Sequence, residues 1–214
     1  MLFRMRFIPL FFILLSVAAP QVVAHPHSFI DMKMSLSAKQ NKYSSINYEW
    51  KMDPMTSADI AYELKGLKPD DPRWKQQEAI IMANVLMQDY FTDFYYQGKK
   101  VSFKRIPDSY HLEKDGFSLI FFFTASFIQP LPIANSHVEI QTYDPSFYVS
   151  MTYPNIQQIT LPSEIAANCN VSLQEANITD SMRAYAFSLD KNDTVDEDLA
   201  LGKQFAQRVD IQCP

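Results

Sequence analysis

Glycine and cysteine are scarce in this chain: its 214 residues include four glycines and two cysteines. So few glycines leave no material for a glycine-rich loop that holds a phosphate group, and no P-loop pattern is present. The patterns G-x-S-x-G, H-E-x-x-H and C-x-x-C are also missing, so the usual signatures of serine hydrolases, zinc proteases and dithiol oxidoreductases are excluded. We therefore expect that the protein is not an enzyme.

Basic residues are in the minority, with 19 Lys and Arg against 24 Asp and Glu and a formal net charge of -5. A surplus of negative charge disfavours nucleic acids and anionic membrane surfaces as partners. Hydrophobic residues make up 47% of the chain and aromatic residues 14%, which is enough for a sizeable core.

Long apolar runs are missing apart from one near the N-terminus. The chain starts with two arginines, runs almost wholly apolar from Phe7 to Ala19, and has small residues before Ala24. This order is typical of a secretory signal peptide, which we expect to span residues 1–24. The run is too short for a comfortable membrane span of about 20 residues, although an uncleaved anchor is the alternative. We expect no membrane span after cleavage.

Alternating patterns predict strands in several places. Residues 29–36 and 46–52 alternate between apolar and polar side chains, as half-buried strands do. The polar stretch 37–45 is expected to join them as a hairpin, and Asp115-Gly116 marks a second hairpin. The Pro-Leu-Pro stretch 130–132 is expected to break the chain.

One segment has a helical period instead. From Arg73, apolar residues recur every three or four positions, which predicts a helix of four to six turns that buries them: Ile80, Ala83, Met87, Phe91 and Phe94. Acidic residues in 193–198 predict the start of a C-terminal helix. The whole pattern predicts an α+β fold, mainly antiparallel β-sheet or sandwich with an inserted amphipathic helix and a C-terminal helix. We expect one domain over residues 25–214.

Cys169 and Cys213 are the two cysteines. In an exported protein two cysteines most simply form one disulfide, which here would attach the C-terminal segment to the body of the domain. A two-cysteine metal site is the alternative, but no histidine lies near either residue in the sequence.

Two of the four histidines stand in the tripeptide His25-Pro26-His27. Cleavage after Ala24 leaves His25 with a free α-amine, which can chelate a metal ion together with its own imidazole. His27 can add a second imidazole, and imidazole suits zinc, copper and nickel. Pro26 has no backbone N–H, so copper binding through deprotonated amides at positions two and three is blocked.

The strand pattern places further oxygen and nitrogen donors near this terminus. Alternation puts Asp31 on the same strand face as His25 and His27, and His137 begins another strand. We predict His25, His27, Asp31 and His137 as the metal ligands. The alternatives are a polar, frayed terminus without a metal and, for His137, a histidine on the surface of a strand.

Four segments carry a resemblance to a known family: H-P-H-S-F-I-D at 25–31, Y-E-W-K-M-D at 48–53, Y-D-P-S-F-Y-V at 143–149 and F-A-Q-R-V-D-I-Q-C at 205–213. The chain resembles Gram-negative periplasmic proteins described as a domain of unknown function or as the periplasmic component of an ABC-type transport system. The most similar members are zinc-binding partners of a NicO-type (nickel/cobalt family) inner-membrane permease.

This resemblance implies a periplasmic metal-binding accessory protein that works with such a permease in zinc acquisition. The ion is expected to be Zn²⁺, with Cu²⁺ or Ni²⁺ as alternatives. Asp144, Tyr148 and the two cysteines match family motifs, although Asp144 can also simply cap a turn by accepting a nearby backbone N–H. The other interpretations are a copper carrier with an N-terminal histidine chelate and a metal-free interaction module of a transporter.

Overall fold

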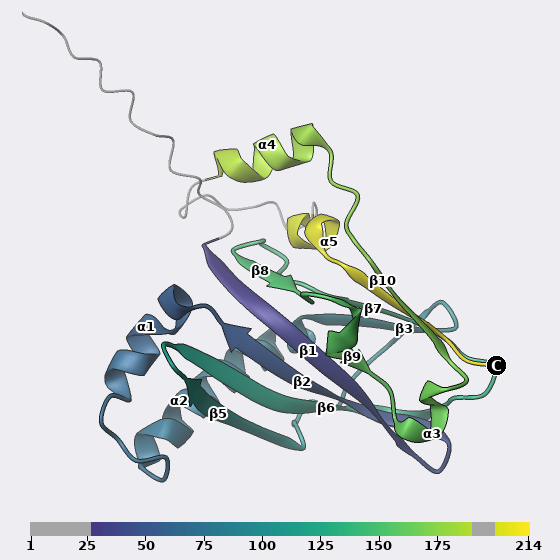
Figure 1. Ribbon diagram of the computed structural model, residues 1–214, viewed down its shortest axis with the longest axis horizontal. Helices are drawn as coiled ribbons and strands as arrows, with labels where there is room; N and C mark the ends of the chain where they lie inside the picture. Colours follow the sequence, from purple (N-terminus) through teal and green to yellow (C-terminus); the bar gives the residue numbers. More distant parts are fainter. Residues whose placement is uncertain (1–26, 190–199) are drawn as a thin grey trace, which may run out of the picture.

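The fold is described from a computed structural model that places residues 27–189 and 200–214. Two β-sheets face each other and share one hydrophobic core, with helices at the edge and at one end (Figure 1). The predicted α+β sandwich is therefore confirmed. Among the described residues, no helix has the length and apolar character needed to cross a membrane. The expected signal peptide, residues 1–24, lies outside the described residues.

Sheet A has six strands in the order β5-β6-β2-β1-β8, and β9 also pairs with β1. Its strands are β1 (Ser28–Lys39), β2 (Lys42–Met52), β5 (Ser109–Asp115), β6 (Ser118–Pro132), β8 (Val149–Thr152) and β9 (Ile159–Thr160). The β1 contacts with β8 and β9 are parallel, and the other pairings are antiparallel. The alternating burial of β1 and β2 follows the predicted pattern.

The hairpin between β1 and β2 is tighter than the sequence suggested. Residues 37–45 were expected to form a polar connection, but both strands continue through this stretch and leave only Gln40 and Asn41 as the turn. Both turn residues have positive φ, which matches the twist of paired strands. Tyr43 is fully buried, so the second strand is anchored in the core immediately after the turn.

The expected break at Pro-Leu-Pro 130–132 is wrong, because β6 continues through Pro132. Leu131 pairs with Tyr43 and Pro132 with Lys42, just beyond a register shift between Tyr43 and Ser45. Proline is tolerated at the end of a strand and beside a bulge, because the strand pairing does not require a backbone N–H from the residue at that position. The Asp115-Gly116 hairpin between β5 and β6 is confirmed.

Sheet B has five strands in the order β10-β11-β7-β3-β4. They are β3 (Thr92–Tyr96), β4 (Lys99–Val101), β7 (His137–Thr142), β10 (Asn170–Gln174) and β11 (Arg208–Gln212), all paired antiparallel. Sheet B meets sheet A through aromatic contacts such as Phe94 with Phe127, whose ring centroids are 4.6 Å apart.

Two helices follow β2 at the edge of the sandwich: α1 (Pro54–Glu63) and α2 (Pro72–Met87). The predicted apolar stripe on α2 is wrong, since Ile80 and Met87 are exposed. The face that packs on the body carries three buried residues instead: Trp74, Met82 and Val85. Helical period alone leaves the buried face open, and here the docking of α2 against β5 and the following turn selects it.

The remaining predicted stripe residues, Phe91 and Phe94, belong to other elements. A short turn η1 (Asp89–Phe91) follows α2, and all three of its residues have positive φ, between 49° and 62°. Left-handed backbone costs about 1–2 kcal/mol per residue for side chains other than glycine. Surrounding contacts must therefore hold this turn in place.

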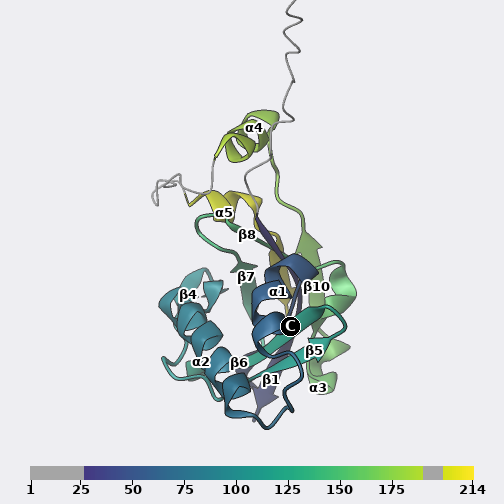
Figure 2. The ribbon, with the colours of Figure 1, turned by 90° about the vertical axis from the view of Figure 1, so that its left-hand side faces the viewer.

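The C-terminal third packs at the ends of the sandwich. It contains η2 (Ile156–Gln158), α3 (Ser163–Ala166), α4 (Asp180–Ser188) and α5 (Leu201–Phe205). Helix α4, capped by the Thr179 side chain, was not predicted. The predicted helix start at 193–198 lies outside the described residues. Figures 1 and 2 both show α4 and α5 at the end of the sandwich where β1 begins.

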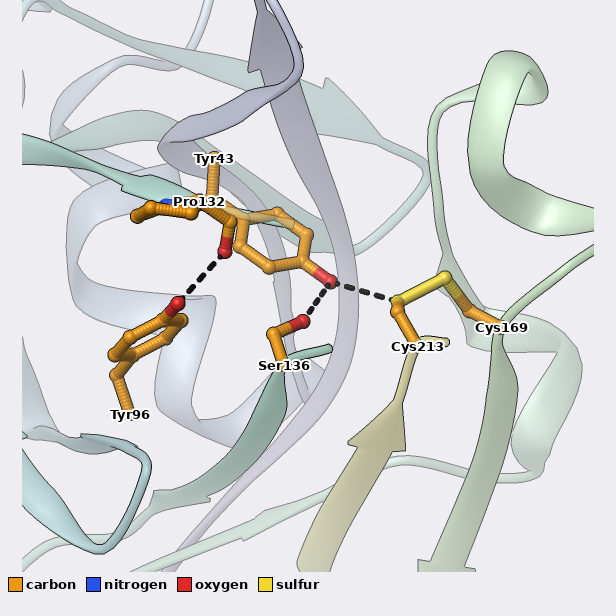
Figure 3. The surroundings of a disulfide bond; sticks show 6 residues. All are labelled: Tyr43, Tyr96, Pro132, Ser136, Cys169 and Cys213. Atoms are coloured by element: carbon orange, nitrogen blue, oxygen red, sulfur yellow. Dashed lines mark hydrogen bonds between the residues drawn. A yellow bond between two sulfur atoms is a disulfide. The ribbon is translucent and has the colours of Figure 1, made fainter. Parts of the chain in front are cut away.

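At the opposite end, the predicted disulfide joins Cys169 and Cys213, which lie 44 residues apart in the chain. It joins the residue that precedes β10 to the residue that follows β11. The Tyr43 hydroxyl lies 3.1 Å from Cys213 Sγ and 3.5 Å from Ser136 Oγ (Figure 3). The disulfide therefore closes the C-terminal strand pair directly on the buried tyrosine of β2.

Candidate functional site

His27, the first residue that the structure describes, is held beside the loop that precedes β8. Its backbone N–H donates to the carbonyl oxygen of Tyr148 at 2.9 Å. Its imidazole lies against the Tyr148 ring, with the ring centroids 4.8 Å apart. The parallel register continues with Ser28 beside Val149. The histidine motif and the Y-D-P-S-F-Y-V motif therefore meet in space, although more than one hundred residues separate them.

The Asp144 side chain organises that loop. Its carboxylate accepts hydrogen bonds from the backbone N–H groups of Ser146 and Val149 and from the Ser146 hydroxyl, at 2.9–3.0 Å. The interpretation of Asp144 as a turn-capping residue is thus confirmed. Tyr148 stays partly exposed, while Phe147 is buried. The loop therefore places Tyr148 at the surface, with the part-buried His27 beside it.

A second aspartate, Asp53, fixes the other side of the β1 start. It caps α1 by accepting from the backbone N–H groups of Met55 and Thr56, and its carboxylate also accepts from Phe29 N–H at 2.9 Å. Phe29 in turn accepts from Asp53 N–H at 3.0 Å. Burial opposes ionisation of Asp53, but the Thr56 hydroxyl and these N–H donors outweigh it and lower its pKa.

Helix α5 closes the same end from the other sheet. The Gly202 N–H donates to the Pro145 carbonyl at 3.1 Å, and the Phe205 ring stacks on Phe147 with centroids 4.1 Å apart. A Cβ at Gly202 would lie 1.7 Å from the Asp144 carbonyl oxygen, so only glycine fits this approach. The F-A-Q-R-V-D-I-Q-C motif therefore begins against the same loop.

An ion cluster around the buried Asp93 carboxylate anchors α5 to sheet B. Asp93 on β3 receives Lys100 Nζ at 2.6 Å, Lys203 Nζ at 2.7 Å and the Tyr143 hydroxyl at 2.8 Å. Burial opposes ionisation of Asp93, but these donors outweigh it and lower its pKa to about 2. Burial, and then the bond to Asp93, raises the pKa of Tyr143 to about 12. The three groups that donate to the Asp93 carboxylate all belong to the fold itself, which favours a structural role for Asp93.

All four motifs thus converge on the end of the sandwich where β1 begins. Tyr148 and Asp53 contact the first residues of β1 directly. Asp144 and Phe205 act one step away, because they hold the loop that carries Tyr148. The donor set at this end is one described imidazole, that of His27. An imidazole can supply one nitrogen ligand to a transition-metal ion.

The other predicted ligands lie elsewhere. His25 falls outside the described residues. Asp31 is on the exposed face of β1, four residues from His27 and therefore about 13 Å along the strand. His137 is the first residue of β7, so it lies at the opposite end of that strand from Tyr143. Its Nε2 lies 3.0 Å from Asp210 Oδ2. The structure does not bring Asp31 or His137 to His27.

No group of three or more His, Cys, Asp or Glu side chains suited to a metal ion occurs within residues 27–189 and 200–214. The fourth histidine, His111, stacks on Phe122 and lies 3.2 Å from Glu113, on the edge strand β5. A metal centre of three or more such side chains at the β1 end would therefore have to include residues outside these two ranges.

Sequence reasoning missed Asp93, Lys203 and Gly202 as residues that build this end. Two signals were present. Asp93 is a charged residue inside the aromatic stretch 90–96, and Gly202 stands in a helical segment rather than in a turn. A carboxylate among aromatic side chains requires partners, and a helical glycine indicates close backbone approach.

Comparisons with known proteins agree with the resemblance at the level of the family. The model of DUF1007, described as a protein of unknown function, matches residues 10–213. An uncharacterized protein of Haemophilus influenzae is 32% identical over 193 residues, which cover 90% of this chain and 92% of the relative. The range 10–213 that the family model matches contains the histidine tripeptide, the loop at Asp144 and both cysteines. On this evidence, the chain belongs to the DUF1007 family.

Proposed function

We propose that this protein is a periplasmic accessory protein that binds a divalent metal ion, zinc in the first place, at its processed N-terminus. The observation that carries the proposal is the attachment of His27 to the Tyr148 loop. Tyr148 and Asp53 hold the first residues of β1 directly, and Asp144 and α5 hold the Tyr148 loop, so the backbone that carries the His27 imidazole has a fixed position. The Cys169–Cys213 disulfide agrees with export to an oxidising compartment.

The chemistry of the donors fits a transition-metal ion. Cleavage after Ala24 leaves the α-amine and imidazole of His25 two residues from His27, hence within about 7 Å of it along the chain. Zinc, copper and nickel all accept this nitrogen set. Two imidazoles and an amine leave a tetrahedral ion one position for water or for a receiving ligand. An incomplete shell suits a protein that passes its ion on.

We further propose that the receiving partner is an inner-membrane permease of the NicO type. This part of the proposal is supported by the resemblance of the four motifs to zinc-binding partners of such permeases. The exposed aromatic residues near His27, Phe29 and Tyr148, would lie on the face presented to it. No catalytic role is proposed.

The experiment is isothermal titration of the exported protein with Zn²⁺, after mass spectrometry has given its first residue. The His25→Ala/His27→Ala variant is expected to lose at least a hundredfold in zinc affinity. The matched control is His111→Ala, which removes an exposed imidazole from another edge of sheet A and should bind like the parent. Equal affinities in the parent and the double variant would refute the site.

Two further measurements separate the alternatives. Competition between Cu²⁺ and Zn²⁺ tests whether the protein is a copper carrier. Copper binds most nitrogen sites more tightly than zinc, so only a copper preference larger than that general difference supports this alternative. Growth of the producing strain under zinc limitation tests the partnership. Full rescue by the double variant would indicate a metal-free interaction module in place of a metal carrier.

A further inference from the structure

Three large apolar side chains stand exposed around the start of β1. Phe29 is 52% exposed, Met55 81% and Phe117 85%. They come from three elements: Phe29 from β1, Met55 from the first turn of α1, and Phe117 from the two-residue turn between β5 and β6. Exposed apolar side chains that gather in one place mark interaction surfaces, whereas isolated ones need no explanation. The grouping of these three residues, the apolar rim, is therefore the decisive point.

The fold gathers the apolar rim around one cleft. Phe29, Pro54 and Ser118 all line a cleft of about 190 Å³. Met55 directly follows Pro54, and Phe117 directly precedes Ser118. The three rim residues therefore surround the same cleft, although they are far apart in the chain.

Hydrogen bonds join the elements that carry the rim. The Asp53 carboxylate accepts from the Phe29 N–H, and the Asp53 N–H donates to the Phe29 carbonyl. The Leu119 N–H donates to the Ser57 hydroxyl oxygen at 2.9 Å, which joins β6 to α1. The rim side chains thus project from elements that are bonded to one another.

The charges around the apolar rim are mixed. Asp31, Lys51 and Asp53 line the same cleft, and Lys114 and Asp115 precede the turn. Lys51 Nζ lies 2.7 Å from Asp115 Oδ2, so this pair compensates its own charge. The rim therefore has no strong field of one sign, and apolar contact decides which partner fits it.

The sequence before β1 identifies the partner. The apolar run Phe7–Ala19, part of the expected signal peptide, ends eight positions before His27. Eight residues span at most about 29 Å when fully extended. A signal peptide inserts its apolar run into the membrane during export, so the start of β1 is held within that distance of lipid until cleavage. The apolar rim surrounds this same start.

The shape of the rim also fits lipid. Met55 stands on a helix start and Phe117 on a hairpin turn, so each can enter the headgroup region while the sheets stay in water. Binding at a membrane surface works in this way, by burial of apolar side chains about 5–10 Å into the headgroup region. A stable protein interface instead needs a packed area of about 800 Å² on each partner, which three separate side chains do not supply.

We propose that the apolar rim docks the processed protein on the surface of a lipid bilayer, with Met55 and Phe117 inserted among the headgroups. Phe29 completes the contact, and the start of β1 faces the membrane. This docking goes beyond the proposed function, shares with it the expected signal peptide, and makes no use of a bound metal ion. It also holds His27 near the bilayer in which a permease lies.

The test is flotation of the exported protein with protein-free vesicles of phosphatidylcholine, alone or mixed with phosphatidylglycerol. Binding is expected at millimolar lipid, because three side chains bury less apolar surface than a single myristoyl chain, whose association constant is about 10⁴ M⁻¹. Both kinds of vesicle should bind the protein equally well. Added sodium chloride should not release it, because salt screens charge and leaves apolar contact in place.

Variants locate the contact. Met55→Ser/Phe117→Ser removes the two most exposed rim side chains and is expected to weaken vesicle binding at least tenfold. The matched control is Ile106→Ser/Ile128→Ser, which removes two other apolar side chains that are 78% and 60% exposed. Both line one groove, and Ile128 lies about 33 Å along β6 from Ser118. The control should bind vesicles like the parent. All four side chains are exposed, so both variants should fold.

Four results would overturn the proposal. The first is no binding of the parent at millimolar lipid, and the second is equal binding by the rim variant and the parent. The third is release by salt or a requirement for phosphatidylglycerol, either of which indicates attraction by charge. The fourth is binding only to vesicles that carry membrane proteins, which assigns the rim to a protein partner. The rim variant should keep the zinc affinity of the parent, so the docking and the metal site fail separately.

Discussion

The backbone N–H of His27 donates to the carbonyl oxygen of Tyr148 at 2.9 Å, so the start of β1 is fixed to a loop that is remote in sequence. The Tyr148 ring also lies against the imidazole. The backbone bond sets the position of His27, and the ring contact restricts its rotation. Both effects lower the entropy that metal binding must otherwise remove.

The Tyr148 ring should therefore matter for metal binding more than for folding. We expect Tyr148→Ala to reduce zinc affinity by about tenfold, the low end of the effect of groups that orient a metal ligand. Because Tyr148 is 44% exposed, stability should change by less than about 1 kcal/mol. Calorimetric titration measures the zinc affinity, and urea unfolding measures the stability. Tyr185→Ala, on α4 and similarly exposed, is the control, and an equal loss there would contradict the assignment.

Gly202 should tolerate no side chain. In Gly202→Ala, the new methyl group meets the Asp144 carbonyl, and relief of the clash moves α5 away from the loop. We expect a loss of about 2–3 kcal/mol in the free energy of unfolding, measured with urea. Gly98→Ala has open space but a φ of 73°, so its loss should be about 1 kcal/mol. A smaller loss at Gly202 than at Gly98 would contradict the close approach.

Asp93 should make the fold sensitive to acid. Its pKa is about 2 in the folded protein against 3.8 as the ordinary value, so the unfolded chain takes up its proton first as the pH falls. The contribution is fully present above about pH 5 and disappears as the pH falls through 4 towards 2. It amounts to about 2 kcal/mol.

The corresponding variant is Asp93→Asn, which leaves Lys100 and Lys203 without their shared carboxylate. We expect it to lose about 2–4 kcal/mol at pH 7 and to show a flatter stability profile between pH 4 and 2. Unfolding measured across pH 2–7 checks both. Asp115→Asn, which breaks an exposed pair with Lys51, should leave the profile close to that of the parent.

Removal of the disulfide should destabilise the domain without changing its site. For a closed loop of this size, the chain-entropy model gives about 4 kcal/mol for the Cys169–Cys213 link. Urea unfolding of Cys169→Ser/Cys213→Ser and of the reduced parent should give similar losses. Zinc affinity should be unchanged, because the link lies beside the C-terminus, at the other end of the sandwich from the start of β1 (Figure 1). A loss of zinc binding in a folded variant would contradict this separation.

Local patterns were reliable wherever one face of a strand is buried. The alternation in β1 and β2 identified their buried residues, because a period of two leaves one possible inner face. The turn at Asp115-Gly116 and the pairing of the two cysteines followed from chemistry that few other arrangements satisfy. These features depend on neighbours in sequence or on a single possible partner.

Other elements depended on contacts that no local pattern contains. The buried face of α2 is chosen by β5 and η1, and Pro132 is accepted because a bulge lies opposite it. Asp93 is stabilised by Lys203, 110 residues later, and no spacing rule links the two. The same is true of His137, since no spacing rule gives its distance from His27, whereas the strand rise over four residues already separates Asp31 from His27.

The amino-acid order alone established the class of fold, the disulfide and the histidine tripeptide as the chemically unusual feature, because each follows from side-chain type and short-range period. Which segments contact His27, and that His137 lies too far away to join it, depended on how distant segments pack. Long-range packing is a sum over many weak contacts between distant residues, so it becomes visible when the whole chain is folded.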